Sequence, residues 1–138
     1  MSKKSFLNIG IPFLILFLAL PLAACRQRQV ANLYDLPAAG ARNNALAQTQ
    51  VRKVILDACQ KRNWVAREIS PGLISATIET RNHMAQIEIP FSGTRYSIIY
   101  KNSRNLKYNS SKNTIHNQYN NWIDYLRKDI EVGLAQVG

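Results

Sequence analysis

Two stretches of the chain place apolar side chains three or four positions apart, the spacing that keeps them on one side of a helix. In residues 44–62 the apolar positions are Ala47, Val51, Val54, Ile55 and Ala58. From Thr114 onward they are Ile115, Tyr119, Trp122, Ile123, Leu126 and Ile130. We expect the first helix to end at Asn63, and the second to be capped by Thr114 and to end at Gly133.

Four segments between these two helices alternate apolar and polar residues, as half-buried strands do. They are residues 64–70, 73–81, 84–91 and 94–101, and turn-forming pairs separate them: Pro71-Gly72, Asn82-His83 and Ser92-Gly93. Connections this short join antiparallel neighbours. The sequence therefore predicts an α+β fold, a four-stranded antiparallel meander with an N-terminal and a C-terminal helix packed on one face.

The start of the chain is typical of a bacterial export signal. Lys3 and Lys4 precede an almost wholly apolar run over residues 6–20, and Pro21 separates this run from the small residues Ala23 and Ala24. An uncleaved transmembrane anchor is the alternative, because residues 6–24 approach the roughly 20 apolar residues that span a bilayer. Pro12 within the run disfavours a continuous helix, and Arg26 and Arg28 just beyond it disfavour a retained anchor.

The ending Leu22-Ala23-Ala24-Cys25 resembles the lipobox of bacterial lipoproteins. This resemblance implies that residues 1–24 are a signal peptide and that the Cys25 sulfur receives diacylglycerol. In that family Asp after the cysteine favours retention in the inner membrane. The present chain has Arg26, so the resemblance implies an outer-membrane anchor, which we expect to hold the protein facing the periplasm.

A second resemblance, to small predicted lipoproteins of Gram-negative bacteria without assigned activity, covers residues 96–130. It runs through Tyr96-Ser97-Ile98, Tyr100-Lys101, Ser103, Asn105-Leu106 and Tyr108, then Ile115-His116, Tyr119-Asn120, Trp122-Ile123, Leu126 and Asp129-Ile130. It implies a shared fold and no particular chemistry, so it transfers no catalytic residue.

The remaining chain divides into two parts. Residues 26–43 have no sustained periodicity, so we interpret 25–43 as the lipidated cysteine followed by a flexible tether. Residues 44–138 are then a single small α+β domain.

Charge narrows the choice of partner. The chain has 18 Lys and Arg against 8 Asp and Glu, and removal of Lys3 and Lys4 with the leader leaves a formal charge near +8. Such an excess favours anionic lipid headgroups or envelope polymers, and export argues against nucleic acid. The candidate site for contact with such anionic groups is the polar stretch 101–112, which is framed by Tyr100 and Tyr108. Its basic residues are Lys101, Arg104, Lys107 and Lys112. The simpler interpretation, which we favour, is a long connection whose tyrosines pack inward.

The sequence predicts no catalytic residue, metal ligand or cofactor. Cys59 lies on an apolar helix flank and is expected to be a buried, inert thiol rather than a reactive one. His83 and His116 have no partner at a metal-ligand spacing. Glu79 and Glu88 occupy the solvent face of neighbouring predicted strands, where they are candidates for acid–base chemistry or simply for surface charge.

These observations leave three hypotheses. The first is a lipid-anchored envelope protein that serves as a non-enzymatic interaction or structural module at the outer membrane. The second is a small envelope enzyme that acts on cell-wall glycan or lipid, which would need a pocket with convergent titratable groups. The third is a partner-binding subunit of a larger envelope assembly.

Overall fold

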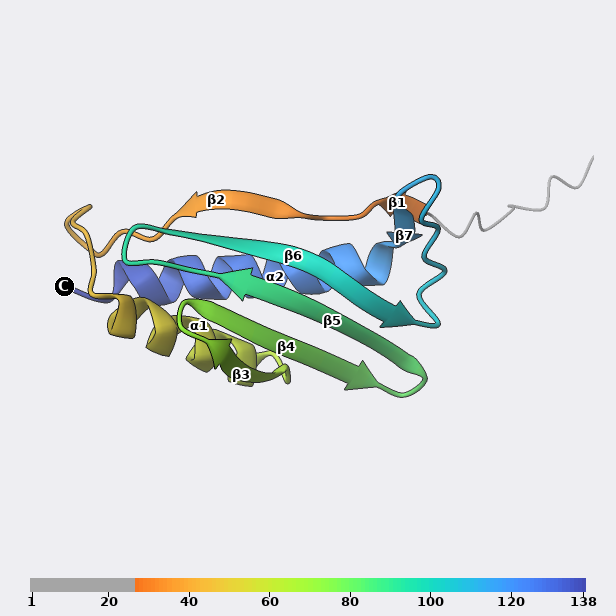
Figure 1. Ribbon diagram of the computed structural model, residues 1–138, viewed down its shortest axis with the longest axis horizontal. Helices are drawn as coiled ribbons and strands as arrows, with labels where there is room; N and C mark the ends of the chain where they lie inside the picture. The colour runs from red at the N-terminus through yellow and green to blue at the C-terminus, as the bar shows by residue number, and fades with distance from the viewer. Residues whose placement is uncertain (1–26) are drawn as a thin grey trace, which may run out of the picture.

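The computed structural model describes residues 27–138, which form two helices and seven strands (Figure 1). In chain order the elements are β1 (Gln27–Gln29), β2 (Leu33–Pro37), α1 (Gln48–Lys61), β3 (Val65–Ser70), β4 (Leu73–Thr80), β5 (His83–Pro90), β6 (Arg95–Arg104), β7 (Thr114–His116) and α2 (Asn117–Ala135). The predicted lipidation site, Cys25, and the leader before it lie outside the described residues.

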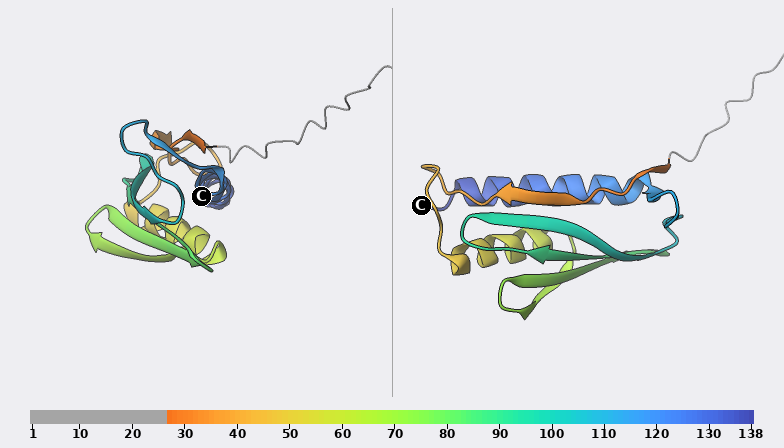
Figure 2. Two further views of the ribbon diagram at one scale, coloured as in Figure 1. Left: turned by 90° about the vertical axis from the view of Figure 1, so that its right-hand side faces the viewer. Right: turned by 45° about the horizontal axis from the view of Figure 1, so that its top comes forward.

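The main sheet has five antiparallel strands in the order β2-β6-β5-β4-β3, and β1 pairs with β7 in a separate two-stranded ladder. Both helices lie on the same side of the main sheet (Figures 1 and 2). The α+β class, the two helices and the meander β3–β6 agree with the sequence prediction. The prediction of four strands was too low, because β2 adds a fifth strand along β6.

Alternating side chains of the meander form the core. Ile74, Ala76 and Ile78 of β4 are buried, as are Ala85, Ile87 and Ile89 of β5 and Tyr96 and Ile98 of β6. The side chains between them are more exposed, so one face of the sheet packs on the helices and the other meets solvent. The buried residues include no charged side chain among those that the structure describes.

Helix α1 ends at Lys61, and Asn63, where the sequence predicted the end, turns the chain out of the helix. This residue has a φ of 61°, a left-handed conformation that Asn tolerates better than most residues. The amide of Trp64 donates to the carbonyl of Cys59 at 2.9 Å, and that of Asn63 donates to Gln60 at 3.1 Å. This pair of bonds is the Schellman arrangement, which satisfies helix carbonyls and turns the chain into β3.

Helix α2 differs from the prediction at both ends. It begins at Asn117, and His116 caps it by accepting a hydrogen bond from the amide of Gln118 at Nδ1, 3.2 Å away. Thr114 instead belongs to β7, where it pairs with Gln29. Gly133 does not end the helix but lies inside it. Its missing side chain lets α1 pack closely here, since a Cβ on this residue would lie 2.7 Å from Cγ1 of Val54.

The predicted tether, residues 25–43, is wrong from Gln27 onward, because these residues are part of the fold. Strand β2 pairs with β6, and Val30 and Ala38 are buried in the core. Polar side chains hold the segment in place. Asn120 accepts from the amide of Ala31 at 3.0 Å and donates to the carbonyl of Gln29 at 2.8 Å. Such bonds leave no apolar periodicity in the sequence, which is why the pattern failed to predict them.

Candidate functional site

The four predicted anionic contacts do not all belong to one loop. Lys101 and Arg104 lie within β6, which continues three residues past the predicted end of this strand. Lys101 forms an ion pair with Glu88 at 3.2 Å, and Arg104 forms one with Glu79 at 2.6 Å. Both basic residues therefore already have carboxylate partners in the same sheet, Glu88 on the adjacent β5 and Glu79 on β4, one strand further away.

Lys107 and Lys112 do lie in the connection between β6 and β7, residues 105–113, and both are exposed. Buried Leu106 holds this loop, and its carbonyl accepts from the amide of His116 at 2.8 Å. The ring of Tyr108 packs on Tyr100 with the centroids 4.6 Å apart, and Tyr100 meets Tyr119 edge-on at 5.5 Å. Tyr100 and Tyr108 thus pack on each other, but Tyr108 is 41% exposed and so does not pack inward as the simpler interpretation predicted.

The fold brings further basic residues to the same end of the molecule. The β4–β5 turn is Arg81-Asn82, one residue earlier than predicted, and Arg81 adopts a φ of 53°. Asn105 donates to the carbonyl of Asn82 at 2.6 Å, and Nδ1 of His83 donates to the carbonyl of Asn105 at 2.9 Å. The turn and the loop are therefore joined directly.

Strand β1 reaches this loop from the other side. The side chain of Gln27 donates to the carbonyl of Lys107 at 3.1 Å, and that of Gln29 donates to the carbonyl of Lys112 at 3.3 Å. We call the resulting surface the basic end, and define it by Arg28, Arg81, Arg104, Lys107 and Lys112. Sequence reasoning missed Arg28 and Arg81, because only the fold places them beside the loop.

The two candidate carboxylates do not converge. Glu79 lies opposite Met84, whereas Glu88 lies opposite Ser75, four residues away along β4. At the usual rise of a strand this separates them by about 13 Å. Because each also has its own basic partner, they form no acid–base pair.

Cys59 is buried, as predicted, and desolvation raises the pKa of its thiol to about 12. The thiolate, which is the nucleophile, is therefore essentially unpopulated at neutral pH. The histidines have structural contacts: His83 binds the loop and His116 caps α2. Within residues 27–138, no three His, Cys, Asp or Glu side chains come together in a way that could hold a metal ion.

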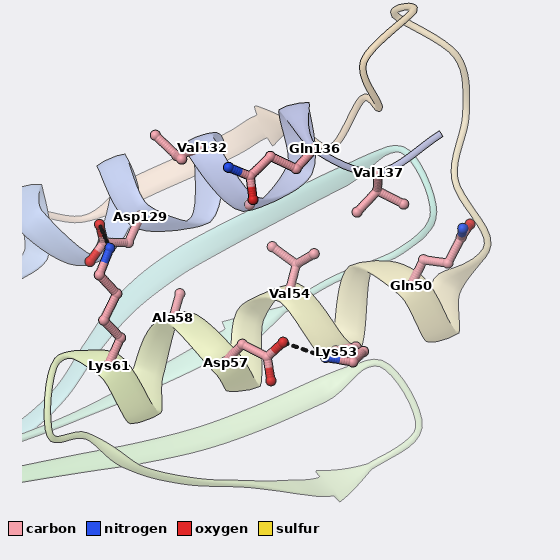
Figure 3. A pocket seen from close by; sticks show the side chains of 11 residues that line it. Gln50, Lys53, Val54, Asp57, Ala58, Lys61, Asp129, Val132, Gln136 and Val137 are labelled. Atoms are coloured by element: carbon pink, nitrogen blue, oxygen red, sulfur yellow. Dashed lines mark hydrogen bonds and ion pairs between the residues drawn. The ribbon is translucent and has the colours of Figure 1, made fainter.

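A groove with a cavity volume of about 540 Å³ runs between α1 and α2 (Figure 3). Val54 and Ala58 of α1 and Val137 after α2 point into it. Ion pairs border it, between Lys53 and Asp57 at 2.6 Å and between Lys61 and Asp129 at 3.1 Å. Hydrogen bonds from Arg62 and then Lys61 hold the pKa of Asp129 below its usual value, so this carboxylate stays charged. The bottom of the groove is apolar and the charged residues at its border are already ion-paired, so the groove is better suited to binding an apolar group than to proton transfer.

A second pocket, of about 470 Å³, has aromatic walls. Trp64, Trp122 and Tyr125 line it together with the polar side chains of Asn63, Glu79 and Gln118, among others. Trp122, which the sequence placed in the core, is only partly buried at this edge. Trp64 is 3% exposed, and its indole N–H has no hydrogen-bond acceptor in the described part of the chain. The sequence indicated Trp122 only as an apolar position of the second helix and did not single out Tyr125.

No protein-family model, curated protein or solved structure matches this chain. Among residues 27–138 neither helix has the length and apolar character needed to cross a membrane.

Proposed function

We propose that this protein is a bacterial lipoprotein, anchored through lipid on Cys25 after removal of residues 1–24. The observation that carries this proposal is the lipobox-like ending Leu22-Ala23-Ala24-Cys25 after a basic and apolar leader. Arg26 after the cysteine favours the outer membrane, and the domain faces the periplasm. The anchored domain is a non-enzymatic interaction or structural module.

The arrangement of the titratable groups supports a module rather than an enzyme. In the described residues Glu79, Glu88 and Asp129 are each held by a basic partner, and the only described cysteine is buried as a neutral thiol. Catalytic sites instead bring a nucleophile, an acid or a base together in one cleft. A small domain in which most charged side chains form ion pairs is better suited to binding a partner than to catalysis.

Metabolic labelling with a fatty acid tests the anchor. Cys25→Ser removes the acceptor sulfur, so the variant should carry no label and keep its leader, which shows as a larger mass. Cys59→Ala is the matched control, because it removes the other cysteine and should be labelled and processed like the parent. Equal labelling of Cys25→Ser and the parent contradicts the proposal. An unlabelled parent with an uncut leader supports the transmembrane anchor instead.

The aromatic pocket favours a second candidate function, action on cell-wall glycan. Sugar rings present C–H faces that pack on aromatic side chains, and Asn63, Glu79 and Gln118 offer hydrogen-bonding groups beside them. Muropeptides should then change the tryptophan fluorescence of the parent and leave that of Trp122→Ala unchanged. Cleavage of the muropeptides by the parent, seen by mass, would favour an enzyme over a binding module. An unchanged parent spectrum contradicts this candidate.

A further inference from the structure

The lipid anchor and the folded domain are separated by almost no chain. The described fold begins at Gln27, which pairs with His116 and binds the loop through its side chain. Cys25 precedes Gln27 by two residues, and two residues of fully extended chain span about 7 Å. A lipid on Cys25 therefore brings the β1 end of the domain to the bilayer surface.

The basic end is the part of the molecule that this short connection presents to the membrane. β1, β7, the 105–113 loop, the β4–β5 turn and the end of β6 lie together, and the chain's C-terminus lies at the opposite end (Figures 1 and 2). The amide of Ala41 donates to the carbonyl of Val137 at 2.8 Å, which places Ala41 at that opposite end.

Charge at this end is strongly one-sided. Residues 27–29, 79–84 and 102–116 contain five basic side chains, all exposed, and one carboxylate, Glu79. Basic residues attract anionic lipid only within about one Debye length of the surface, roughly 10 Å at 0.1 M salt. The reach of two residues keeps the β1 side of this surface within that range.

We infer that the basic end docks on anionic phospholipid headgroups of the leaflet that holds the Cys25 lipid, and so fixes the orientation of the domain on the membrane. This inference rests on the proposed lipid anchor. Among anionic envelope components, the headgroups are favoured because the covalent attachment places them next to this surface.

The test uses the full protein purified with its lipid, whose presence is first established by intact mass. The protein is placed in vesicles of phosphatidylcholine alone or mixed with phosphatidylglycerol. Ser111→Cys adds a thiol to the basic end, and Ala41→Cys adds one to the opposite end; a membrane-impermeant maleimide reports how accessible each is. We expect several-fold slower labelling of Ser111→Cys in the phosphatidylglycerol vesicles, reversed at 1 M salt, and equal rates for Ala41→Cys in both.

Two sets of substitutions separate location from total charge. Arg81, Lys107 and Lys112 replaced together by Gln should abolish the slower labelling of Ser111→Cys. Arg42, Lys53 and Arg67 are exposed residues outside the basic end, and their replacement by Gln removes the same charge and should preserve the slower labelling. Equal labelling rates of Ser111→Cys in the two vesicle types overturn the inference and leave the lipoprotein proposal intact. The same holds if both triple variants lose the slower labelling to an equal extent. A mass without lipid on Cys25 overturns both the inference and the lipoprotein proposal.

Discussion

Gly133 shows how a single residue sets the distance between the two helices. Its place in α2 faces Val54 of α1, and a Cβ at this position would lie 2.7 Å from a methyl group of a stiff, β-branched side chain. We expect Gly133→Leu to lower the free energy of unfolding by about 1–3 kcal/mol, the usual cost of overpacking. Chemical denaturation measures this. Val132→Leu, at a neighbouring position that is 56% exposed, is the control and should leave stability nearly unchanged.

Cys59 makes stability depend on pH in the alkaline range. Burial raises the pKa of its thiol from 9.0 to about 12, so the unfolded chain loses this proton at a lower pH than the folded chain. The unfolded state is therefore favoured as pH rises above about 9. The expected loss is about 1 kcal/mol between pH 9 and 10, below the range where the buried tyrosines contribute fully. Cys59→Ala should remove this part of the decrease in the free energy of unfolding with pH. An identical pH dependence of the free energy of unfolding in the variant and the parent would contradict the role given to Cys59.

At the scale of elements, the N-terminal segment depends on side chains from α2. Asn120 binds the backbone of Gln29 and Ala31 through both atoms of its amide. Asn120→Ala should lower the free energy of unfolding by about 1–3 kcal/mol, because backbone groups lose their partners. It should also speed hydrogen exchange at the amide of Ala31. Asn121→Ala, at the exposed next position, is the control, and equal exchange in the two variants would show that Asn120 does not hold the segment.

At the scale of the whole molecule, the segment before α1 completes the core and protects a sheet edge. A chain that begins at Asn44, the domain start that the sequence pattern indicated, lacks β1 and β2 and exposes the edge of β6. It also loses Val30 and Ala38 and the partly buried Leu33 and Leu36 from the core. Full burial of one Val or Leu contributes roughly 1.5–3 kcal/mol, against a total stability of about 5–15 kcal/mol for a domain.

We therefore expect the chain that begins at Asn44 to melt at a much lower temperature than one that begins at Gln27, and to self-associate through β6. Thermal unfolding and size-exclusion chromatography measure the two effects. Equal melting temperatures would mean that residues 27–43 act as a tether after all.

Local pattern determined most of the fold. Alternation in residues 65–90 and the turn at Pro71-Gly72 specify antiparallel neighbours, and the stripes of α1 and α2 specify which side of each helix is buried, because these signals depend on residues close in sequence. The buried state of Cys59 followed from the same stripe. The close helix contact at Gly133 did not, because it depends on Val54 in the other helix.

Only the tertiary structure decided where the polar residues lie. Residues 29–31 are held by hydrogen bonds to the side chain of Asn120, about 90 positions away, and such long-range pairing leaves no periodic trace in the sequence. The same holds for the basic end, where Arg28 and Arg81 meet Lys107 and Lys112 from separate elements. Hydrophobic spacing predicts which side chains are buried, whereas a polar surface is assembled by contacts that only the folded chain makes.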